Sequence, residues 1–130
     1  MNIYGIGTDI VNIDRIKKIF RQRGDTFKNK VYTNFEISKC NKRKNKNECF
    51  AKRFAAKEAL SKALGTGIRK GINFKDIEIV NDTYGKPFIR LKGSTASFLK
   101  KKIKNKNYSI YLSLSDDDPW AQATVVVSYN

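Results

Sequence analysis

Three side chains in this sequence have types and spacing that could do chemistry. Glu58 and Lys62 lie four residues apart within a segment rich in Ala, Leu, Lys and Glu, residues 53–67. A helix is predicted there, and four-residue spacing puts both side chains on one of its faces. Asp9 stands in an otherwise apolar, β-branched segment. A carboxylate in that setting needs an ion-pair partner, hydrogen bonds or a metal ion.

Each of these residues also has a plainer interpretation. Glu58 and Lys62 at this spacing could form a surface ion pair worth about 0.3–0.5 kcal/mol. Asp9 could cap the helix that follows its strand. Ala51 and Ala55 flank the Glu58 and Lys62 face, and small neighbours let a bulky ligand approach, so we expect this face to be open. The core side of the helix is expected to consist of Ala56, Leu60, Ala63 and Leu64.

The segments before this helix must position Asp9. Residues 3–11 predict a strand, and its two glycines indicate that another backbone comes close. Asn12 can cap a helix with an apolar inner stripe, and residues 24–32 are expected to be a connecting segment. Thr33 and Glu36 have the spacing of a capping box, which predicts a second, short helix.

The segments after it predict further strands and one more helix. Glycines at 65 and 67 are suited to the end of that helix. The other expected elements are a strand at 74–80 with a turn at 81–87 and a hairpin partner at 88–91, a helix at 95–104 capped by Ser94, and a closing hairpin of strands at 108–114 and 122–129.

Composition narrows the function classes. The net charge is +15, from 27 Lys and Arg against 12 Asp and Glu, which favours polyanions or acidic proteins as partners. The chain has no histidine, so Ser/His and Cys/His catalysis are excluded. Cys40 and Cys49 make no zinc site by themselves, and we expect free thiols in a reducing compartment.

Length and hydropathy predict a single domain over residues 1–130. The hydrophobic fraction of 40% suffices for a core, but a monomer of this size would bury a modest fraction of its surface, which favours association. No apolar run approaches the ~18–20 residues that a membrane span needs. We therefore expect no membrane span and a cytoplasmic location.

Several segments together resemble one family, the holo-[acyl-carrier-protein] synthases, which are small 4′-phosphopantetheinyl transferases. The matching segments occur in the order of the family and extend over nearly the whole chain. They are Gly5–Val11, Arg53–Ala59 with Ser61–Gly67, Asn81-Asp82 with Gly85–Pro87, and Ser113–Ser115 with Ala121–Ala123.

The resemblance implies a transfer reaction. In this family the 4′-phosphopantetheine arm of coenzyme A moves to a serine of apo-acyl carrier protein, adenosine 3′,5′-bisphosphate is released, and Mg²⁺ is required. The activity would support fatty acid biosynthesis. The family also implies an α+β fold, with an antiparallel sheet packed on a long central helix, assembled as a homotrimer with coenzyme A at the subunit boundaries.

The resemblance also assigns roles to residues. Asp9 and Glu58 would be catalytic residues and Mg²⁺ ligands, and Lys62 would be a catalytic residue that holds pyrophosphate oxygens. Arg15 matches the carrier-protein site, and spacing along the helix adds Lys18 and Arg21. The positions that match coenzyme A contacts are Lys44, Arg53, Ser61, Gly65, Pro87 and Tyr111.

Two positions depart from the family pattern. Many relatives have histidines where this chain has Tyr111 and Asp116. The first of these histidines helps hold the nucleotide, and Tyr111 could hydrogen-bond there but carries no positive charge near neutral pH. The general base stays open between Glu58, acting through a water molecule, and a metal-bound hydroxide.

Two other functions remain as alternatives. The charge and the 12% aromatic content would suit a nucleic-acid-binding module, whose affinity falls steeply with salt, although the sequence has no recognised nucleic-acid motif. A catalytically inactive relative that only binds carrier protein is the other, and the retention of Asp9, Glu58 and Lys62 argues against it.

Overall fold

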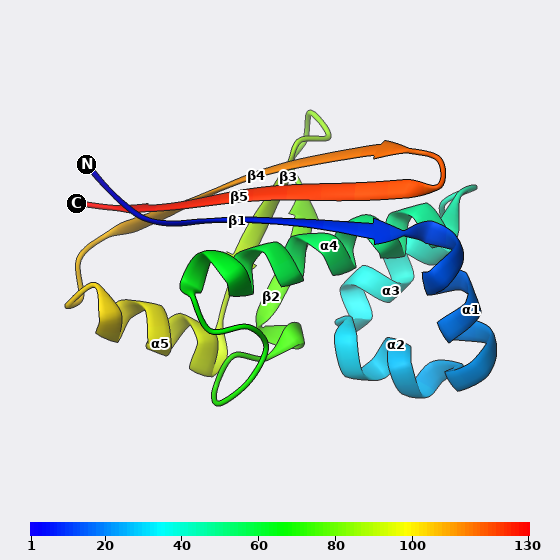
Figure 1. Cartoon of the computed structure of the whole chain (residues 1–130), viewed down its shortest axis with the longest axis horizontal. Coiled ribbons are helices and arrows are strands. Elements are labelled where there is room, and N and C mark those ends of the chain that lie inside the picture. The colour runs from blue at the N-terminus through cyan, green and yellow to red at the C-terminus, as the bar shows by residue number, and fades with distance from the viewer.

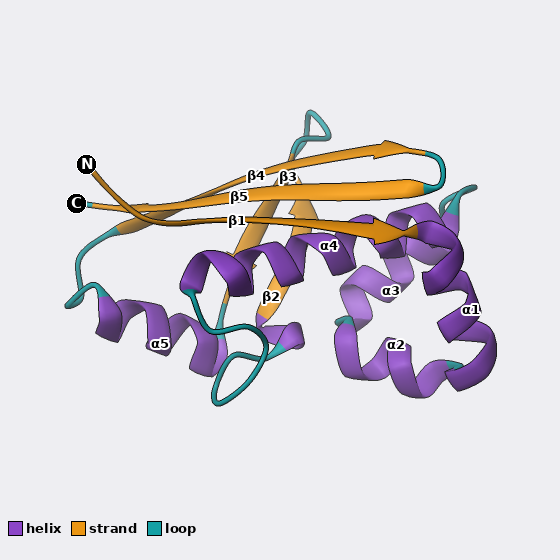
Figure 2. Cartoon of the chain, viewed as in Figure 1, coloured by secondary structure: helices purple, strands orange, loops and turns teal.

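The computed structural model describes all residues 1–130 and has a mixed α/β architecture with two antiparallel sheets (Figures 1 and 2). In chain order the elements are β1 (Asn2–Asn12), α1 (Ile13–Arg23), α2 (Asp25–Val31), α3 (Asn34–Asn41), α4 (Lys46–Leu64), a 3₁₀ turn η1 (Phe74–Asp76), β2 (Ile77–Asn81), β3 (Pro87–Leu91), α5 (Gly93–Lys102), β4 (Tyr108–Asp117) and β5 (Trp120–Tyr129).

The larger sheet has the order β1-β5-β4 and lies along α4 (Figure 1). The strand predicted at 3–11 and the closing hairpin are confirmed as β1 and as β4 with β5. Gly5 and Gly7 lie against the backbone of α4, where an added Cβ would overlap the carbonyl oxygens of Ala63 and Ala59. The predicted close approach of a second backbone is therefore confirmed, and it brings β1 directly onto α4.

Helix α4 is 19 residues long and is buried on more sides than its sequence indicated. Ala51 and Ala55 have no exposed surface, so the expectation that their face is open is wrong. The sheet covers one side of α4, while α1 and α3 contact it elsewhere. As predicted, the helix ends at Gly65, which adopts the left-handed conformation at φ 84°.

The segment between β1 and α4 forms three short helices. Asn12 caps α1 through hydrogen bonds from the amides of Asp14 and Arg15, as predicted. Thr33 and Glu36 form the predicted capping box of α3. The expected connecting segment is instead largely helix α2, whose Val31 is buried in the core; tertiary burial outweighs the weak local signal.

A buried ion pair joins the helices to the second sheet. Lys57 Nζ donates to Glu36 Oε1 at 2.7 Å, and neither side chain has exposed surface. Lys57 also donates to the carbonyl oxygens of Phe74 and Ile77, and Glu36 Oε2 accepts from the Ile79 amide. This network fixes α3, α4 and β2 to one another.

The smaller sheet is the predicted hairpin of β2 and β3, and α5 follows it. Phe74–Asp76, which were expected in the first strand, form the turn η1 instead. The prediction that Ser94 caps this helix is wrong, because α5 begins at Gly93 and Lys92 is the N-cap residue. Asp76 replaces a local cap by accepting hydrogen bonds from the amide and hydroxyl of Thr95 at 3.2 and 2.9 Å. The carboxylate comes from a separate element, which the local sequence of α5 does not reveal.

The two cysteines form a disulfide between the end of α3 and the start of α4. The expectation of free thiols is therefore wrong. The turn between the helices brings the Cα atoms of Cys40 and Cys49 to 5.5 Å, within the range that a disulfide requires. The structure contains no helix with the length and apolar character of a membrane span.

Candidate functional site

Asp9, Glu58 and Lys62 come together where β1 crosses α4. Lys62 Nζ donates to Asp9 Oδ1 and to the carbonyl oxygen of Thr8, both at 3.0 Å. Lys62 therefore pairs with Asp9 and not with Glu58, so the interpretation of Glu58 and Lys62 as a surface pair is wrong. Asp9 caps no helix, since Asn12 does so. The contact requires β1 to lie close to α4, and Gly5 and Gly7 permit this.

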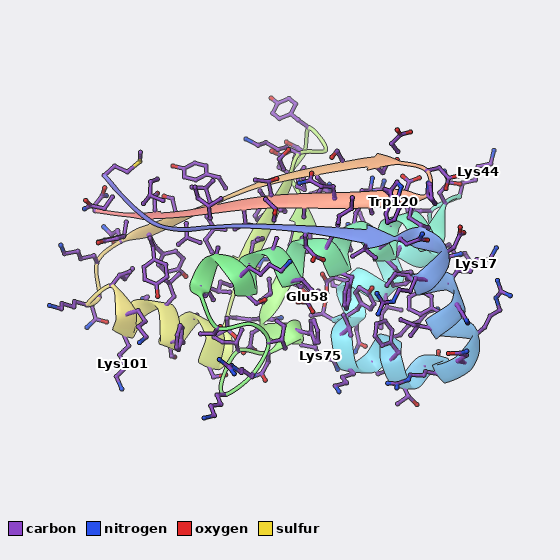
Figure 3. All side chains as sticks on the ribbon, viewed as in Figure 1. Lys17, Lys44, Glu58, Lys75, Lys101 and Trp120 are labelled. Atoms are coloured by element: carbon purple, nitrogen blue, oxygen red, sulfur yellow. A yellow bond between two sulfur atoms is a disulfide. The ribbon has the colours of Figure 1, made fainter.

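A pocket of about 500 Å³ opens beside these groups. Both carboxylates face it, and Arg15 from α1 and Trp120 from β5 contribute to its wall. Glu58 lies near the middle of the molecule and Trp120 at the end of the sheet beside α1 (Figure 3). This carboxylate pocket is lined by Asp9, Ile10, Val11, Asn12, Arg15, Ile16, Ile19, Phe54, Glu58 and Trp120.

The electrostatics of Glu58 favour a positive partner. Partial burial raises the pKa of the Glu58 carboxyl, the negative charge of Asp9 raises it further, and Lys62 partly offsets the rise. Glu58 has no ion-pair partner within the chain. Since the Lys62 ammonium pairs with Asp9 alone, the Glu58 carboxylate can take a further cation or a proton.

The oxygen donors suit a hard divalent cation. Mg²⁺ usually takes one or two protein carboxylates and completes its shell with water and phosphate oxygens. The structure has no cluster of three or more Asp, Glu or Cys side chains that could hold a metal, so the candidate set is the pair Asp9 and Glu58. Because both face the same pocket, this pair fits such an ion when a phosphate ligand supplies further oxygens.

A second pocket, of about 460 Å³, lies between the start of α4 and the turn of the β2-β3 hairpin. Its wall holds four positively charged side chains and one carboxylate. This basic pocket is lined by Arg43, Lys44, Asn45, Glu48, Cys49, Lys52, Arg53, Asn81, Gly85, Pro87 and Leu114.

Arg53 is the most constrained cation in the basic pocket. Its side chain is 4% exposed, and its guanidinium donates to Asn81 Oδ1 at 3.0 Å and to Cys49 Sγ at 3.1 Å. The Nε atom is buried without a hydrogen-bond partner. Burial lowers the pKa of Arg53, while Glu36 partly offsets this. A buried cation that lacks a carboxylate partner is suited to an anionic ligand.

The residues predicted to contact coenzyme A divide into groups. Lys44, Arg53 and Pro87 meet in the basic pocket. Ser61 is fully buried in α4 and donates to the Glu58 carbonyl oxygen, and Gly65 follows the end of that helix. Tyr111 is 54% exposed on β4. A single chain therefore does not place all six residues in one pocket.

The predicted carrier-protein residues share an exposed face of α1. Arg15, Lys18 and Arg21 are all exposed, and none of them forms an ion pair. Arg15 also lines the carboxylate pocket with Asp9 and Glu58. The basic face of α1 therefore adjoins the pocket at one of its residues.

Sequence reasoning missed several residues of these pockets. Arg43 belongs to a Lys/Asn-rich run, residues 41–47, whose composition alone indicates no binding role, and Asn81 gave no signal beyond the resemblance. Lys52 reaches Asp116 on β4 at 3.1 Å, a contact across 64 positions that no local pattern reveals. The one local signal for Lys52 is its four-residue spacing from Glu48, which puts both side chains on one face of α4.

Comparisons with known proteins show the family of this chain. Residues 5–122 match the model of the 4′-phosphopantetheinyl transferase superfamily, which defines the class. A holo-[acyl-carrier-protein] synthase of Wolbachia pipientis is 51% identical over 128 residues, which cover 96% of this chain and 97% of that protein.

Solved structures are similar over the same extent. The holo-[acyl-carrier-protein] synthase of Neisseria meningitidis has a TM-score of 0.88 and 36% identity, covering 97% of this chain and 98% of that one. The Helicobacter pylori synthase, solved in complex with coenzyme A, has a TM-score of 0.80 and 36% identity, covering 95% and 99%. The chain belongs to the holo-[acyl-carrier-protein] synthase family, as its motifs predicted, and is a transferase.

Proposed function

We propose that this enzyme transfers the 4′-phosphopantetheine group of coenzyme A to a serine of apo-acyl carrier protein and releases adenosine 3′,5′-bisphosphate. The observation that carries the proposal is that Asp9, from a distant part of the sequence, lines one pocket with Glu58 and accepts a hydrogen bond from Lys62. The complex of the Helicobacter pylori relative with coenzyme A supports the same substrate here.

Lys62 has the geometry of a phosphate-binding group. Two of its three ammonium protons point to Asp9 and Thr8, and the side chain is 53% exposed. The remaining donor can reach a pyrophosphate oxygen and stabilise the negative charge that develops there. The hydrogen bond to the Thr8 carbonyl holds the ammonium beside the carboxylates.

Asp9 and Glu58 are proposed to hold Mg²⁺ with phosphate oxygens of the substrate. When bound, the ion would polarise the pyrophosphate and neutralise charge on the leaving group. The raised pKa of Glu58 also suits it to accept the serine proton through a water molecule.

The basic pocket is proposed to bind the phosphate-rich end of coenzyme A. Arg53 supplies a buried guanidinium with an unpartnered Nε, and Lys44 supplies an exposed charge at the rim. Pro87 and Gly85 provide a wall without charge. The buried Arg53 and the exposed Lys44 together favour a ligand that carries more than one phosphate.

A homotrimer would explain two features of the monomer. The outer face of the larger sheet is open and carries Ile6, Ile10 and Tyr111, which are 63%, 61% and 54% exposed. Ile6 and Tyr111 lie in register through Val126 of β5, so they share this face. Burial of the face between copies would also let residues of two copies surround one coenzyme A molecule. Light scattering tests the proposal: three chains of 14.9 kDa are expected per particle.

The basic face of α1 is proposed to bind the carrier protein through Arg15, with Lys18 and Arg21 beside it. All three are exposed, and opposite charges speed encounter more than they tighten binding. A role in fatty acid biosynthesis, a cytoplasmic location and a single domain over residues 1–130 complete the proposal.

A mass-shift assay tests the function. Purified enzyme is incubated with coenzyme A, Mg²⁺ and the apo-acyl carrier protein of the same organism, and the carrier is weighed by mass spectrometry. We expect a gain of one phosphopantetheine unit, which chelation of Mg²⁺ abolishes. A carrier whose acceptor serine is replaced by alanine serves as the control. No gain with the authentic carrier would refute the proposed function.

A further inference from the structure

The Cys40–Cys49 disulfide closes a segment that lines part of the basic pocket. It joins the last turn of α3 to the first turn of α4. Four residues between the two cysteines, Arg43, Lys44, Asn45 and Glu48, line the pocket. The disulfide therefore holds both ends of the segment from which these pocket groups project.

The disulfide also contacts the buried cation of the pocket. Arg53 donates to Cys49 Sγ at 3.1 Å, and Cys49 itself lines the pocket. A disulfide sulfur is a weak, uncharged acceptor, so Arg53 keeps its charge available for a ligand. Cys40 has no exposed surface, and Cys49 is 4% exposed.

We propose that this disulfide is a reversible redox control of the basic pocket, and that its reduction weakens the binding of phosphate-bearing nucleotides. The inference rests on the proposed function of the pocket. Disulfides in reducing compartments are usually transient or redox-sensing, and this one lies at a candidate substrate site.

The chemistry is thiol–disulfide exchange with a dithiol. One thiolate of the dithiol attacks Cys49 Sγ, which is the cysteine that faces the pocket, and the S–S bond breaks with the electron pair passing to Cys40 Sγ. The second thiol of the dithiol then displaces Cys49 Sγ. The products are two cysteine thiols and an oxidised, disulfide-containing dithiol. Two electrons and two protons pass from the dithiol to the protein.

Reduction weakens ligand binding in the basic pocket through two effects of the same sign. The segment from Cys40 to Cys49 loses its covalent closure, so ordering Lys44 and Arg43 around a ligand costs more conformational entropy. The freed Cys49 thiol then lies beside the Arg53 guanidinium, which favours the thiolate. That thiolate competes with a phosphate for the same cation.

Thermodynamic linkage makes the effect reciprocal. If oxidation tightens the binding of a nucleotide by some factor, bound nucleotide shifts the disulfide equilibrium toward oxidation by the same factor. A ligand in the pocket also covers Cys49, which is the cysteine that a reductant would reach through the pocket.

The first experiment measures binding in both redox states. The probe is adenosine 3′,5′-bisphosphate, which has phosphates but no thiol that could exchange with the protein. Calorimetric titration is done on protein without reductant and on protein reduced with dithiothreitol, which adds no charge. We expect ~5- to 20-fold weaker binding after reduction, a common size for coupling between two events. In denaturant, which exposes both sulfurs, iodoacetamide is expected to label two cysteines of the reduced protein and none of the unreduced protein.

Two single variants separate the two effects. Cys40→Ala and Cys49→Ala both remove the disulfide, but only Cys40→Ala leaves a thiol beside Arg53. Both variants are expected to bind the probe more weakly than the oxidised protein and to be insensitive to dithiothreitol. Cys40→Ala is expected to bind it most weakly above neutral pH, where the thiolate forms. Circular dichroism checks that both variants fold.

The results distinguish this inference from the proposed function. Equal affinity of oxidised and reduced protein, with normal transfer to the carrier, would overturn the redox control alone. Labelling of both cysteines without reduction would overturn it as well. If the oxidised protein neither bound the probe nor modified the carrier, both proposals would be wrong.

Discussion

Two of the lysine–carboxylate pairs of helix α4 have completely different surroundings. Lys57 is fully buried with Glu36 at 2.7 Å, whereas Lys62 is 53% exposed and lies 3.0 Å from Asp9. Lys57 has three acceptors from the protein, Glu36 and the carbonyl oxygens of Phe74 and Ile77, which match its three protons. It has no donor left for a ligand.

The difference teaches where this fold separates structure from function. Burial lowers the pKa of Lys57, and Glu36 partly offsets the effect. Three hydrogen bonds hold this lysine in place. Lys62 keeps one donor and access to solvent. Two lysines five residues apart on helix α4, Lys57 and Lys62, are thus a structural cation and a candidate catalytic cation.

The largest predicted effect is on the buried pair. Lys57→Met should lower the free energy of unfolding by roughly 3–5 kcal/mol, because it leaves the Glu36 carboxylate buried without a cation. Urea unfolding measures this. Adding Glu36→Gln, which removes the unpaired charge but keeps an acceptor oxygen, should recover part of the loss. A loss no greater than that of Lys62→Met would contradict the comparison.

The contact of β1 with α4 gives the next prediction. Gly7→Ala should cost about 1–3 kcal/mol of stability, since the new methyl group overlaps the Ala59 carbonyl oxygen and pushes the strand outward. Transfer activity should fall too, because Asp9 moves away from Lys62. Thr8→Ala, on the exposed side of the same strand, serves as the stability control. If Gly7→Ala and Thr8→Ala unfold at the same urea concentration, the close packing is not required.

Replacing Lys62 should affect transfer activity strongly and stability little, whereas replacing Lys57 should lower stability strongly. Lys62→Met is expected to change the free energy of unfolding by less than about 1 kcal/mol, because the pair is largely exposed. Its transfer rate should fall by roughly 10²–10³-fold, as for other groups that stabilise developing charge. Steady-state kinetics and urea unfolding of one preparation check both. A stable variant with full activity would remove Lys62 from the site.

The smallest predicted effect concerns the pH dependence of stability. The pKa of Glu58 is raised in the folded protein by burial first and then by Asp9, so its ionised form lowers stability above that pKa. Glu58→Gln should therefore stabilise the protein at pH 7, by less than about 1 kcal/mol because solvent screens a half-exposed charge. The gain should disappear below about pH 4, where Glu58 is protonated in both states. Thermal melts across pH measure this difference.

Much of the fold follows from local sequence patterns. Asn12 and the Thr33–Glu36 pair marked helix starts because a cap involves residues within three positions, and Gly65 marked the end of α4. Helix α2 and the capping of α5 by Asp76 were missed. Both depend on partners from other elements, and no short-range pattern encodes them.

The candidate site divides in the same way. Asp9, Glu58 and Lys62 were predicted because their types and spacing were unusual and matched a family, and the structure brings them together. The disulfide was not predicted, because the spacing of two cysteines nine positions apart gives no information on the turn between them. Long-range contacts such as Lys52 with Asp116 require the folded sheet.

The most direct measurement compares Glu58→Gln with Asp25→Asn in the mass-shift assay. Asp25 is an exposed carboxylate in the first turn of α2 and lines neither pocket, whereas Glu58 lines the carboxylate pocket with Asp9. The account predicts a folded Glu58→Gln enzyme that leaves the carrier unmodified, while Asp25→Asn still adds the phosphopantetheine unit. Full modification of the carrier by Glu58→Gln at the rate of the unaltered enzyme would contradict it.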